Sequence, residues 1–407
     1  MRISSLHLIN IGPFKKADIT FIEPGRPSDL LTPPVVIFTG INGSGKSIVI
    51  DSLRALLMGN ANKSINRNII RDEKDFKIKA TVCLDLSNAF TLIESKKLSS
   101  GKIETSFNAL NYHLHDAKAG YLKENLSRWI LDYWNSNITT DTFEIKNLNA
   151  IKPAEYLSES LTGKYKNIEI TNAISYFDYL QSGRDPNETE LGTFLIEKFK
   201  QIISLSIING EFDYVSRSGL TVFIKINNKS IELSKVSSGN LYLIQRLTSL
   251  LSKAYSVFLL YGGSIDKICD VPGLLLIDEL ENHFHPKWQK LLLEIILKIF
   301  PNLQIVLTTH SPFILSSIKN SKVFVCNPVD DYSVITDETE NYSNKNIEEI
   351  LSMPIFETDP FSKEISDLLE QRKIAITKED KGEISRIEKL LIELNPEYFR
   401  YLNFDNL

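Results

Sequence analysis

The chain has 407 residues, 43% of them hydrophobic and 24% charged, a composition typical of a globular protein with a large core rather than of a disordered chain. Its net charge of −5 gives no sign of a nucleic-acid-binding composition, and no apolar run reaches the roughly 18 residues needed to cross a membrane. Three cysteines without CxxC spacing exclude a disulfide scaffold and favour the cytoplasm.

The N-terminal part is predicted to pass from strands into a glycine-rich turn and a helix. Residues 1–14 alternate apolar and polar side chains, as a strand does. Val35–Thr39 is a short β-branched run that predicts a buried parallel strand. Apolar residues at helical spacing over Ser47–Met58 predict a helix. Lys77–Leu86 and Phe90–Ile93 predict strands of an antiparallel layer.

The middle of the chain is predicted to form a separate, mostly helical lobe. Residues 112–209 are rich in Tyr, Leu and Asn and are helical in character. Thr221–Ile226 has the alternation of a strand, and Leu241–Tyr261 predicts a long helix.

The C-terminal part is predicted to add two apolar strands and then charged helices. Leu274–Ile277 and Gln304–Leu307 are the strands, and Pro286–Phe300 between them predicts one amphipathic helix. Ser362–Ile376 and Glu379–Leu394 carry many Lys and Glu at helical spacing.

The glycine-rich turn has the sequence GINGSGKS, which fits GxxxxGK[ST] and lies between a predicted strand and a predicted helix. Glycines let backbone N–H groups turn inward as an anion nest, and the helix start adds the positive end of its dipole. Lys46 is predicted to reach the β- and γ-phosphates, and the Ser47 hydroxyl to hold Mg²⁺. The predicted phosphate-binding residues are Gly40, Asn42, Gly43, Ser44, Gly45, Lys46 and Ser47.

A second signal is the apolar strand that ends in Asp278 and Glu279. In phosphoryl-transfer sites such a strand end supplies an aspartate that orients Mg²⁺ and an adjacent residue that polarises water. Alone, a solvated strand end explains the pair better. Together with the phosphate loop, the pair predicts Asp278 as a metal residue and Glu279 as the general base.

Two weaker elements gain meaning in this order. Ser237, Ser238 and Gly239 precede a predicted helix and resemble the SSG signature of ATP-binding-cassette proteins, in which a helix start faces ATP held by a neighbouring subunit. His310 follows a predicted strand in TTHSP, where an imidazole can hydrogen-bond the γ-phosphate and report its loss. Read alone, the first is more often a helix cap and the second a loop residue.

Taken together, GINGSGKS, VSSGN, LLLIDELENHFHP and TTHSPF resemble the motif set of compact Rad50/SMC/RecF-type ATPases, the AAA_21-type group. Within it, KPAEYL, ISYFDYLQSGRD, SSGNLYLIQR, IDELENHFHPKWQ and NPEYFRYL resemble PtuA, the ATPase of Septu and related retron anti-phage systems. The resemblance implies an α/β fold, a P-loop ABC-type nucleotide-binding domain with a mixed sheet flanked by helices. The implied parts are an N-terminal ATPase part (1–110), a mostly helical inserted lobe (111–235), a part with signature, Walker B and switch histidine (236–330), and a helical C-terminal extension (331–407).

The same resemblance implies the reaction and the partners. ATP with Mg²⁺ would lie between the phosphate loop of one subunit and the signature of another in a homo-oligomer, and Glu279 and His310 would serve its hydrolysis to ADP and phosphate. A separate HNH nuclease resembling PtuB is the implied partner in anti-phage defence, and DNA or a retron nucleic acid stays open as another. The family also places a glutamine on the metal. Of the two glutamines between phosphate loop and signature, Gln181 and Gln201, we prefer Gln181 because it lies in YFDYLQSGRD.

The sequence departs from its relatives in two respects. Asn240 stands where many carry an acidic residue or Gln after SSG, which leaves the strength of the signature open. The sequence shows no long heptad region, which removes the DNA-tethering coiled coil of Rad50 and SMC proteins. The C-terminal aromatic residues either pack back on the domain or anchor a partner; they are Tyr398, Phe399, Tyr401 and Phe404.

Other interpretations stand beside this one. A RecF/Rad50-like repair ATPase would bind DNA through its own surface. The basic stretch that suits such binding, half neutralised by neighbouring acids, comprises Lys63, Arg67, Arg71, Lys74, Lys77 and Lys79. Glu281, His283 and His285 suggest a second metal, although a contact between subunits explains them more simply. The ATPase subunit of a membrane transporter is disfavoured by the SSG context and the Tyr-rich insertion.

Overall fold

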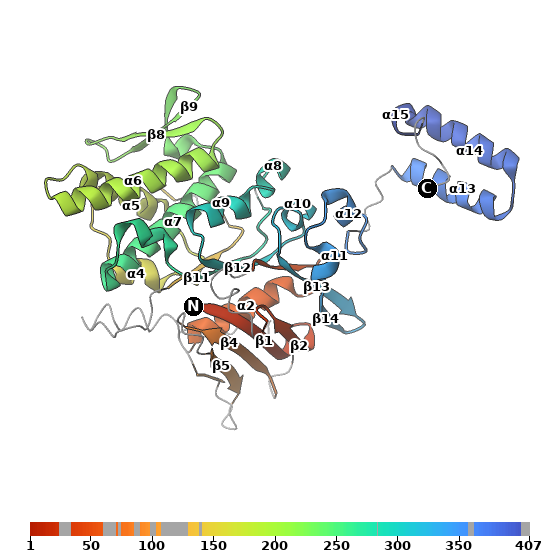
Figure 1. Ribbon diagram of the computed structural model, residues 1–407, viewed down its shortest axis with the longest axis horizontal. Helices are drawn as coiled ribbons and strands as arrows, with labels where there is room; N and C mark the ends of the chain where they lie inside the picture. The colour runs from red at the N-terminus through yellow and green to blue at the C-terminus, as the bar shows by residue number, and fades with distance from the viewer. Residues whose placement is uncertain are drawn as a thin grey trace. The chain divides into compact units, whose positions relative to one another are not determined.

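A computed structural model describes residues 1–23, 34–59, 71, 75–84, 90–97, 103–106, 129–137, 141–282, 284–356 and 362–399. The chain divides into two compact units, residues 1–347 and 348–407 (Figure 1). Every residue predicted for the phosphate site lies in the larger unit, so the fold of that unit positions the site.

The larger unit is built on an 11-stranded mixed sheet in the order β6-β5-β4-β1-β2-β14-β13-β3-β12-β11-β7. Along this order the strands are β6 Ile103–Thr105, β5 Phe90–Lys97, β4 Lys77–Cys83, β1 Arg2–Ile11, β2 Phe14–Thr20, β14 Tyr332–Asp337, β13 Lys322–Val329, β3 Val36–Thr39, β12 Leu303–Thr308, β11 Gly273–Ile277 and β7 Ile130–Trp134. The five from β13 to β7 pair in parallel, whereas β6 to β2 pair antiparallel. Because the carboxyl ends of parallel strands share one edge, the loops after β3, β11 and β12 meet there.

Burial along the strands follows the two halves of the sheet. The parallel strands β3, β11, β12 and β7 are buried at every residue, as expected where helices cover both faces. In the antiparallel half, β2 and β4 alternate buried and more exposed residues, so one face of this part meets solvent. The core of this half includes α2 (Lys46–Met58), which Figure 1 shows beside β1 and β4.

A helical layer surrounds one long helix, α7 (Ser238–Tyr261). Every residue of α7 from Leu241 to Val257 is buried, and the helix contacts β7 and three other helices. Those three are α4 Pro153–Ser158, α5 Asn167–Gln181 and α6 Pro186–Ser206. A small antiparallel sheet packs on α6, and its strands are β8 Gly210–Val215, β9 Val222–Ile226 and β10 Lys229–Glu232 (Figure 1).

The turn between β9 and β10 shows why this small sheet forms. Asn227 and Asn228 both have positive φ, 50° and 64°, which matches the two-residue turn that hairpins prefer and that asparagine tolerates. The remaining short elements of the larger unit are η3 Leu233–Lys235, η4 Ile265–Asp270, α8 Pro286–Gln289, α9 Leu292–Ile299, α10 Pro312–Leu315 and α11 Thr339–Tyr342. Helix α12, Ile347–Leu351, spans the boundary between the units.

Three local features differ from the sequence-based expectations. Strand β7, inside the expected helical lobe, joins the edge of the main sheet beside β11. The expected helix Pro286–Phe300 is two helices, because α9 turns five apolar residues inward while α8 buries none and uses Gln289 to bind a neighbouring loop. The expected start of the C-terminal extension at residue 331 falls inside the β13–β14 hairpin, which belongs to the sheet.

The smaller unit is helical. It contains α13 Lys363–Thr377, α14 Lys381–Leu394 and α15 Pro396–Phe399. Ile387, Leu391 and Phe399 form its buried core, and Arg372 Nε donates to Glu388 Oε1 at 2.9 Å between the two long helices. No helix within the described ranges has the length and apolar character that a bilayer span requires.

Candidate functional site

The turn after β3 has the backbone shape that its glycines predict. Gly40 has φ +140°, and a Cβ there would lie 2.3 Å from the carbonyl oxygen of Cys326. Gly45 has φ +103°, and a Cβ there would lie 2.6 Å from both Pro13 and Phe14. Helix α2 starts directly afterwards with no side-chain cap and no acidic residue in its first turn. Its first N–H groups are therefore available to an anion.

Lys46 folds back over this turn. Its buried ammonium donates to the carbonyl oxygens of Gly40 and Ile41 at 3.0 and 2.9 Å. Burial lowers the pKa of Lys46, and the nearby thiol of Cys326 and carboxylate of Glu281 oppose that shift. The hydroxyl of Ser44 is buried and, among the described residues, has no hydrogen-bond partner. A cation and a free donor thus face a loop shaped for phosphate, which fits a nucleotide.

The acidic strand end meets the phosphate loop. Asp278 follows β11, and its Oδ1 accepts from the hydroxyls of Ser47 at 2.9 Å and Thr308 at 2.6 Å. Burial raises the pKa of Asp278. A serine hydroxyl beside an aspartate is the oxygen donor set that Mg²⁺ prefers, so these residues fit the metal that the motif implies. The sequence placed Ser47 and Asp278 in one site, and the structure brings them together.

Glu279 is held in an uncommon backbone conformation. Its φ is +53°, in the left-handed region that residues other than glycine seldom adopt outside turns and functional sites. Its N–H donates to the Thr308 hydroxyl at 2.8 Å, which fixes the turn against β12. The side-chain amide of Asn282 donates to its carboxylate at 2.7 Å. These hydrogen bonds come from neutral donors, so they orient the Glu279 carboxylate without forming an ion pair with it.

His310 follows β12 at the same edge of the sheet. Burial lowers the pKa of its imidazole, and the positive charge of Lys46 lowers it further. Its main-chain N–H donates to Glu281 Oε1 at 2.5 Å, and the neighbouring Thr309 hydroxyl donates to Glu281 Oε2 at 2.7 Å. Burial raises the pKa of Glu281. Strand β12 pairs in parallel with β3, and the Thr309 N–H donates to the Phe38 carbonyl oxygen at 3.0 Å, so the predicted switch histidine lies at the sheet edge from which the phosphate loop starts.

The other predicted site residues lie elsewhere in the chain. Ser237, Ser238 and Gly239 form the start of α7, where both serines are exposed and no side chain caps the helix. Gln181 ends α5, where its main chain packs against Gly192 of α6. Within the described ranges, no hydrogen bond or ion pair joins these four predicted residues to Ser47 or Asp278. The roles of the signature and of Gln181 therefore stay predictions.

Three residues of the site were not predicted for it: Thr308, Asn282 and, in its observed contact, Glu281. All three lie within three residues of a predicted one along the chain, so proximity to a motif was the available signal. Of the residues considered for other roles, Lys63, Arg67, Lys74, His283, Tyr401 and Phe404 lie outside the described residues. In the part that the structure describes, no cluster of three His, Cys, Asp or Glu residues is arranged to hold a metal.

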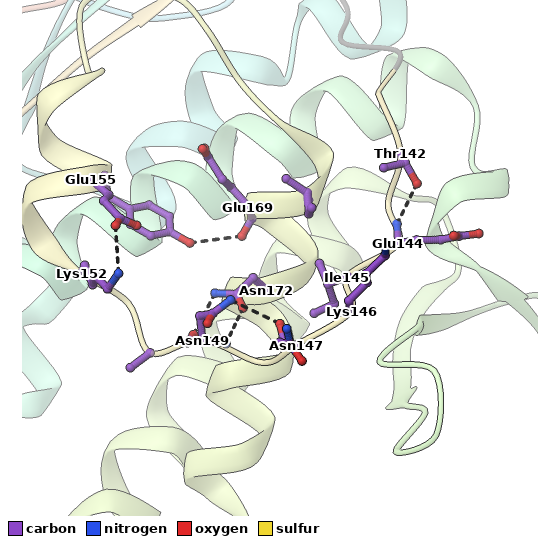
Figure 2. A pocket seen from close by; sticks show the side chains of 13 residues that line it. Thr142, Glu144, Ile145, Lys146, Asn147, Asn149, Lys152, Glu155, Glu169 and Asn172 are labelled. Atoms are coloured by element: carbon purple, nitrogen blue, oxygen red, sulfur yellow. Dashed lines mark hydrogen bonds and ion pairs between the residues drawn. The ribbon is translucent and has the colours of Figure 1, made fainter.

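A separate cavity of about 700 Å³ lies in the helical lobe between α4, α5 and the segment before them (Figure 2). Its polar groups bind one another: Asn149 and Asn172 exchange two hydrogen bonds of 2.9 Å, and Lys152 pairs with Glu155 at 3.2 Å. The lining residues are Thr142, Glu144, Ile145, Lys146, Asn147, Asn149, Ala150, Lys152, Glu155, Tyr156, Ile168, Glu169 and Asn172. The cavity shares no residue with the predicted phosphate site, which lies at the ends of β3, β11 and β12.

The sequence matches two family models and several known proteins. The AAA_21 family model, "AAA domain, putative AbiEii toxin, Type IV TA system", matches residues 93–316, and a second AAA domain model matches residues 1–117. The retron Vc95 probable ATPase of Vibrio cholerae serotype O1 biovar El Tor is 27% identical over 54% of this chain and 42% of its own length. Septu protein PtuA of Bacillus thuringiensis is 25% identical over 77% of this chain and 76% of its own length. The chain thus spans less than half of the first relative.

The fold agrees with the family match. The SMC head bound to the C-winged helix domain of ScpA aligns with a TM-score of 0.50 at 15% identity, over 83% of this chain and 98% of that one. The predicted α/β class, a mixed sheet flanked by helices, is confirmed by this likeness and by the sheet itself. Since the first model covers more than half of the residues, the chain belongs to the AAA_21 family of AAA domains.

Proposed function

We propose that the chain binds ATP with Mg²⁺ at the loop from Gly40 to Ser47, hydrolyses it to ADP and phosphate, and joins a second copy while ATP is bound. The observation that carries the proposal is the hydroxyl of Ser47 donating to Asp278 across 231 positions of sequence. This contact unites a phosphate nest with an acidic strand end. The order and spacing of both elements suit phosphoryl transfer.

The loop supplies binding. Its inward N–H groups and the start of α2 attract the negative phosphates, and Lys46 exchanges the carbonyls of Gly40 and Ile41 for phosphate oxygens. Ser47 and Asp278 are the residues that would hold Mg²⁺. When bound, the ion offsets charge on the phosphate oxygens.

Glu279 and His310 supply chemistry. The Glu279 carboxylate, oriented by Asn282, accepts a proton from the attacking water. His310 is neutral near pH 7 because burial and Lys46 lower its pKa, so its ring offers one N–H donor to the γ-phosphate. Loss of that phosphate removes the hydrogen-bond acceptor and leaves the loop of His310 free to change.

The start of α7 supplies the contact between copies. Ser237 and Ser238 are exposed, and the first turn of this long helix carries no acidic residue. A helix N-terminus of this kind attracts phosphate. We infer that it faces ATP bound by a second copy, which makes the oligomer depend on nucleotide.

The biological setting is inferred from relatives. The names Septu protein PtuA and retron Vc95 probable ATPase support a role in anti-phage defence, in which hydrolysis controls a partner nuclease of the HNH type, similar to PtuB. Retron nucleic acid or DNA is a further ligand to test. Co-purification of an HNH nuclease with this chain would support the proposal, and an assembly purified under ATP without any nuclease would oppose it.

Two variants test the reaction. Lys46→Ala should abolish ATP binding, whereas Glu279→Gln should bind ATP, lower turnover by about 100-fold or more and hold the oligomer together. Equilibrium ATP binding, phosphate release and light scattering measure the three properties. Glu294→Gln, an exposed carboxylate on α9, is the matched control and should keep the parental rate. Parental turnover in Glu279→Gln would show that the base is another group.

One observation favours the DNA-binding alternative. On the outer face of the antiparallel half, Lys77, Lys79 and Lys96 surround Glu94 at 3.8, 3.3 and 2.9 Å, which leaves a local excess of positive charge. A repair ATPase of RecF type would bind DNA through such a face, with affinity that falls steeply as salt rises. Salt-dependent DNA binding by the isolated chain, weakened by Lys79→Glu, would support this second function.

A further inference from the structure

We propose that Glu281 is a positioning residue for hydrolysis: its carboxylate holds the main chain of the loop that carries His310. The inference rests on the proposed function, because it assumes that His310 acts on ATP.

The geometry of the carboxylate carries the proposal. Each oxygen of Glu281 takes one donor from the loop, Oε1 from the His310 N–H at 2.5 Å and Oε2 from the Thr309 hydroxyl at 2.7 Å. Hydrogen bonds to a charged acceptor are shorter and stronger than those between neutral groups. Two such bonds to consecutive residues fix the orientation of the peptide unit between them. That peptide sets the direction in which the imidazole leaves the backbone.

The rest of the loop is held by neutral groups. The Thr309 N–H donates to the Phe38 carbonyl oxygen at 3.0 Å, which continues the sheet from β12 to β3. The Ser311 hydroxyl donates to Gln289 Oε1 at 2.5 Å. Among these three anchors only Glu281 is a carboxyl group and only it binds the His310 main chain. Its loss frees His310 while both flanking anchors stay in place.

Glu281 also shares a turn with the predicted base. The Asn282 N–H donates to the Glu279 carbonyl oxygen at 3.2 Å, and the Phe284 N–H donates to the Glu281 carbonyl oxygen at 3.1 Å. The turn after β11 therefore carries both the group that accepts the proton from water and the group that holds the histidine loop.

Two other roles would suit the Glu281 side chain, that of a ligand of a second metal and that of a purely structural residue. As a ligand of a second metal, Glu281 would use the lone pairs that its two loop hydrogen bonds leave over, and among the described residues no cluster of three His, Cys, Asp or Glu side chains is arranged to hold an ion. As a merely structural residue, it would affect stability and ATP affinity as much as turnover. A positioning residue instead acts through His310, so its removal matters only while His310 is present.

A double-mutant cycle tests this dependence. Glu281→Ala should lower kcat by about 10- to 100-fold while the Kd for ATP changes less than about threefold, since the phosphate loop is untouched. Glu281→Gln should recover most of the rate, because its carbonyl oxygen accepts from the His310 N–H and its amide donates to the Thr309 hydroxyl. In the His310→Ala background, Glu281→Ala should cause no further loss. Additive losses in the double variant would overturn the proposal.

Other outcomes separate this proposal from the proposed function. If His310→Ala is slow but Glu281→Ala turns over at the parental rate, the positioning role is wrong and the role of His310 stands. If His310→Ala is itself at the parental rate, the proposed switch is wrong and the positioning role is lost with it, while Lys46→Ala still reports on ATP binding.

Thr309 tests the same contact from the loop side, should Glu281→Ala fail to fold. Thr309→Ser keeps the hydroxyl that donates to Glu281 and should keep the rate within about twofold. Thr309→Val removes this donor, together with the acceptor for the Ser311 N–H, and should slow turnover about 3- to 10-fold. Equal rates for the two variants, with matched melting temperatures, would count against the carboxylate contact.

Discussion

Two carboxylates on neighbouring strands of the parallel sheet have opposite surroundings. Asp132, in β7, is 1% exposed and accepts from Lys253 Nζ at 2.6 Å, from the Tyr165 hydroxyl at 2.7 Å and from Trp134 Nε1 at 3.1 Å. Asp278, after β11, accepts from two hydroxyls, and among the described residues no ion pair involves it.

The difference separates a structural carboxylate from one reserved for a ligand. Lys253 neutralises Asp132 within the chain, so the pair links β7 to α7 without any outside partner. The charge of Asp278 has only neutral donors, and burial raises its pKa. A charge left in this state attracts an external cation, as expected of a metal residue. Variants of the two sites should therefore lose different properties.

The largest effect is expected at the ion pair of Asp132 and Lys253, called the closed pair because each charge has its partner within the chain. Asp132→Ala leaves the Lys253 ammonium buried without its counter-ion, which should lower the unfolding free energy by about 3–5 kcal/mol. Chemical denaturation with an unchanged m-value measures the loss. The double variant Asp132→Asn with Lys253→Met removes both charges, keeps an acceptor for the Tyr165 and Trp134 donors, and should regain most of it. A double variant as unstable as the single one would show that the pair contributes more than charge neutralisation.

The open site comprises Asp278 and the phosphate-loop and His310 residues at the same sheet edge. A variant of this site should lose activity instead of stability. Asp278→Asn keeps a carbonyl oxygen in the place of Oδ1, which accepts both hydroxyls, but removes the charge that would hold Mg²⁺. Turnover should fall about 100-fold, and the unfolding free energy at pH 7 should not fall. The sign follows from the raised pKa: the folded state binds the proton more tightly, so ionised Asp278 opposes folding at neutral pH. A destabilised Asn variant with full turnover would reverse the assignment of the two carboxylates.

A matched pair of smaller changes sharpens the contrast. Tyr165→Phe removes one of several donors to Asp132 and should cost about 1 kcal/mol of stability. Thr308→Val removes both the donor to Asp278 and the acceptor for the Glu279 N–H, so it should slow turnover about tenfold. Denaturation and phosphate release on both variants check the two results. If Tyr165→Phe slows turnover as much as Thr308→Val does, the closed pair also serves the reaction.

The local motifs of the site could be predicted from sequence, because each is a short run with a defined mechanism. GINGSGKS between a strand and a helix predicted the loop at Lys46, and an apolar strand ending in DE predicted the edge at Asp278, which the structure places beside Ser47. The strand pattern also predicted β3, β11 and β12 within two residues. Local sequence suffices where backbone shape follows from residue type.

Contacts between distant segments could not be predicted in this way. Strand β7 is a five-residue run, ILDYW, with an acid at its centre, and its burial depends on Lys253, 121 positions away. The positive φ of Glu279 accompanies two hydrogen bonds of its main chain, one to the Thr308 hydroxyl and one from the Asn282 N–H, and leaves no mark on the pattern of apolar residues. The partner of the signature at Gly239 stays a prediction, because one chain does not contain the interface that would test it. The role of Gln181 also stays a prediction, because among the described residues no hydrogen bond joins it to Ser47 or Asp278.

A pH scan examines the open site with the smallest expected effect. Burial and Lys46 lower the pKa of His310 in the folded state, whereas the unfolded imidazole titrates near about 6.5. Between these two values the unfolded chain binds more protons, so the parent protein loses stability as the pH falls through about 6.5. The variant His310→Gln has no imidazole and therefore lacks this pH-dependent loss of stability. The unfolding free energy of the variant minus that of the parent should therefore be larger near pH 5.5 than near pH 8, by a small amount because solvent screens the partly exposed ring. Equal differences at both pH values would mean that His310 is not held neutral beside the phosphate loop, and the hydrogen-bond donor assigned to its ring would have to come from another group.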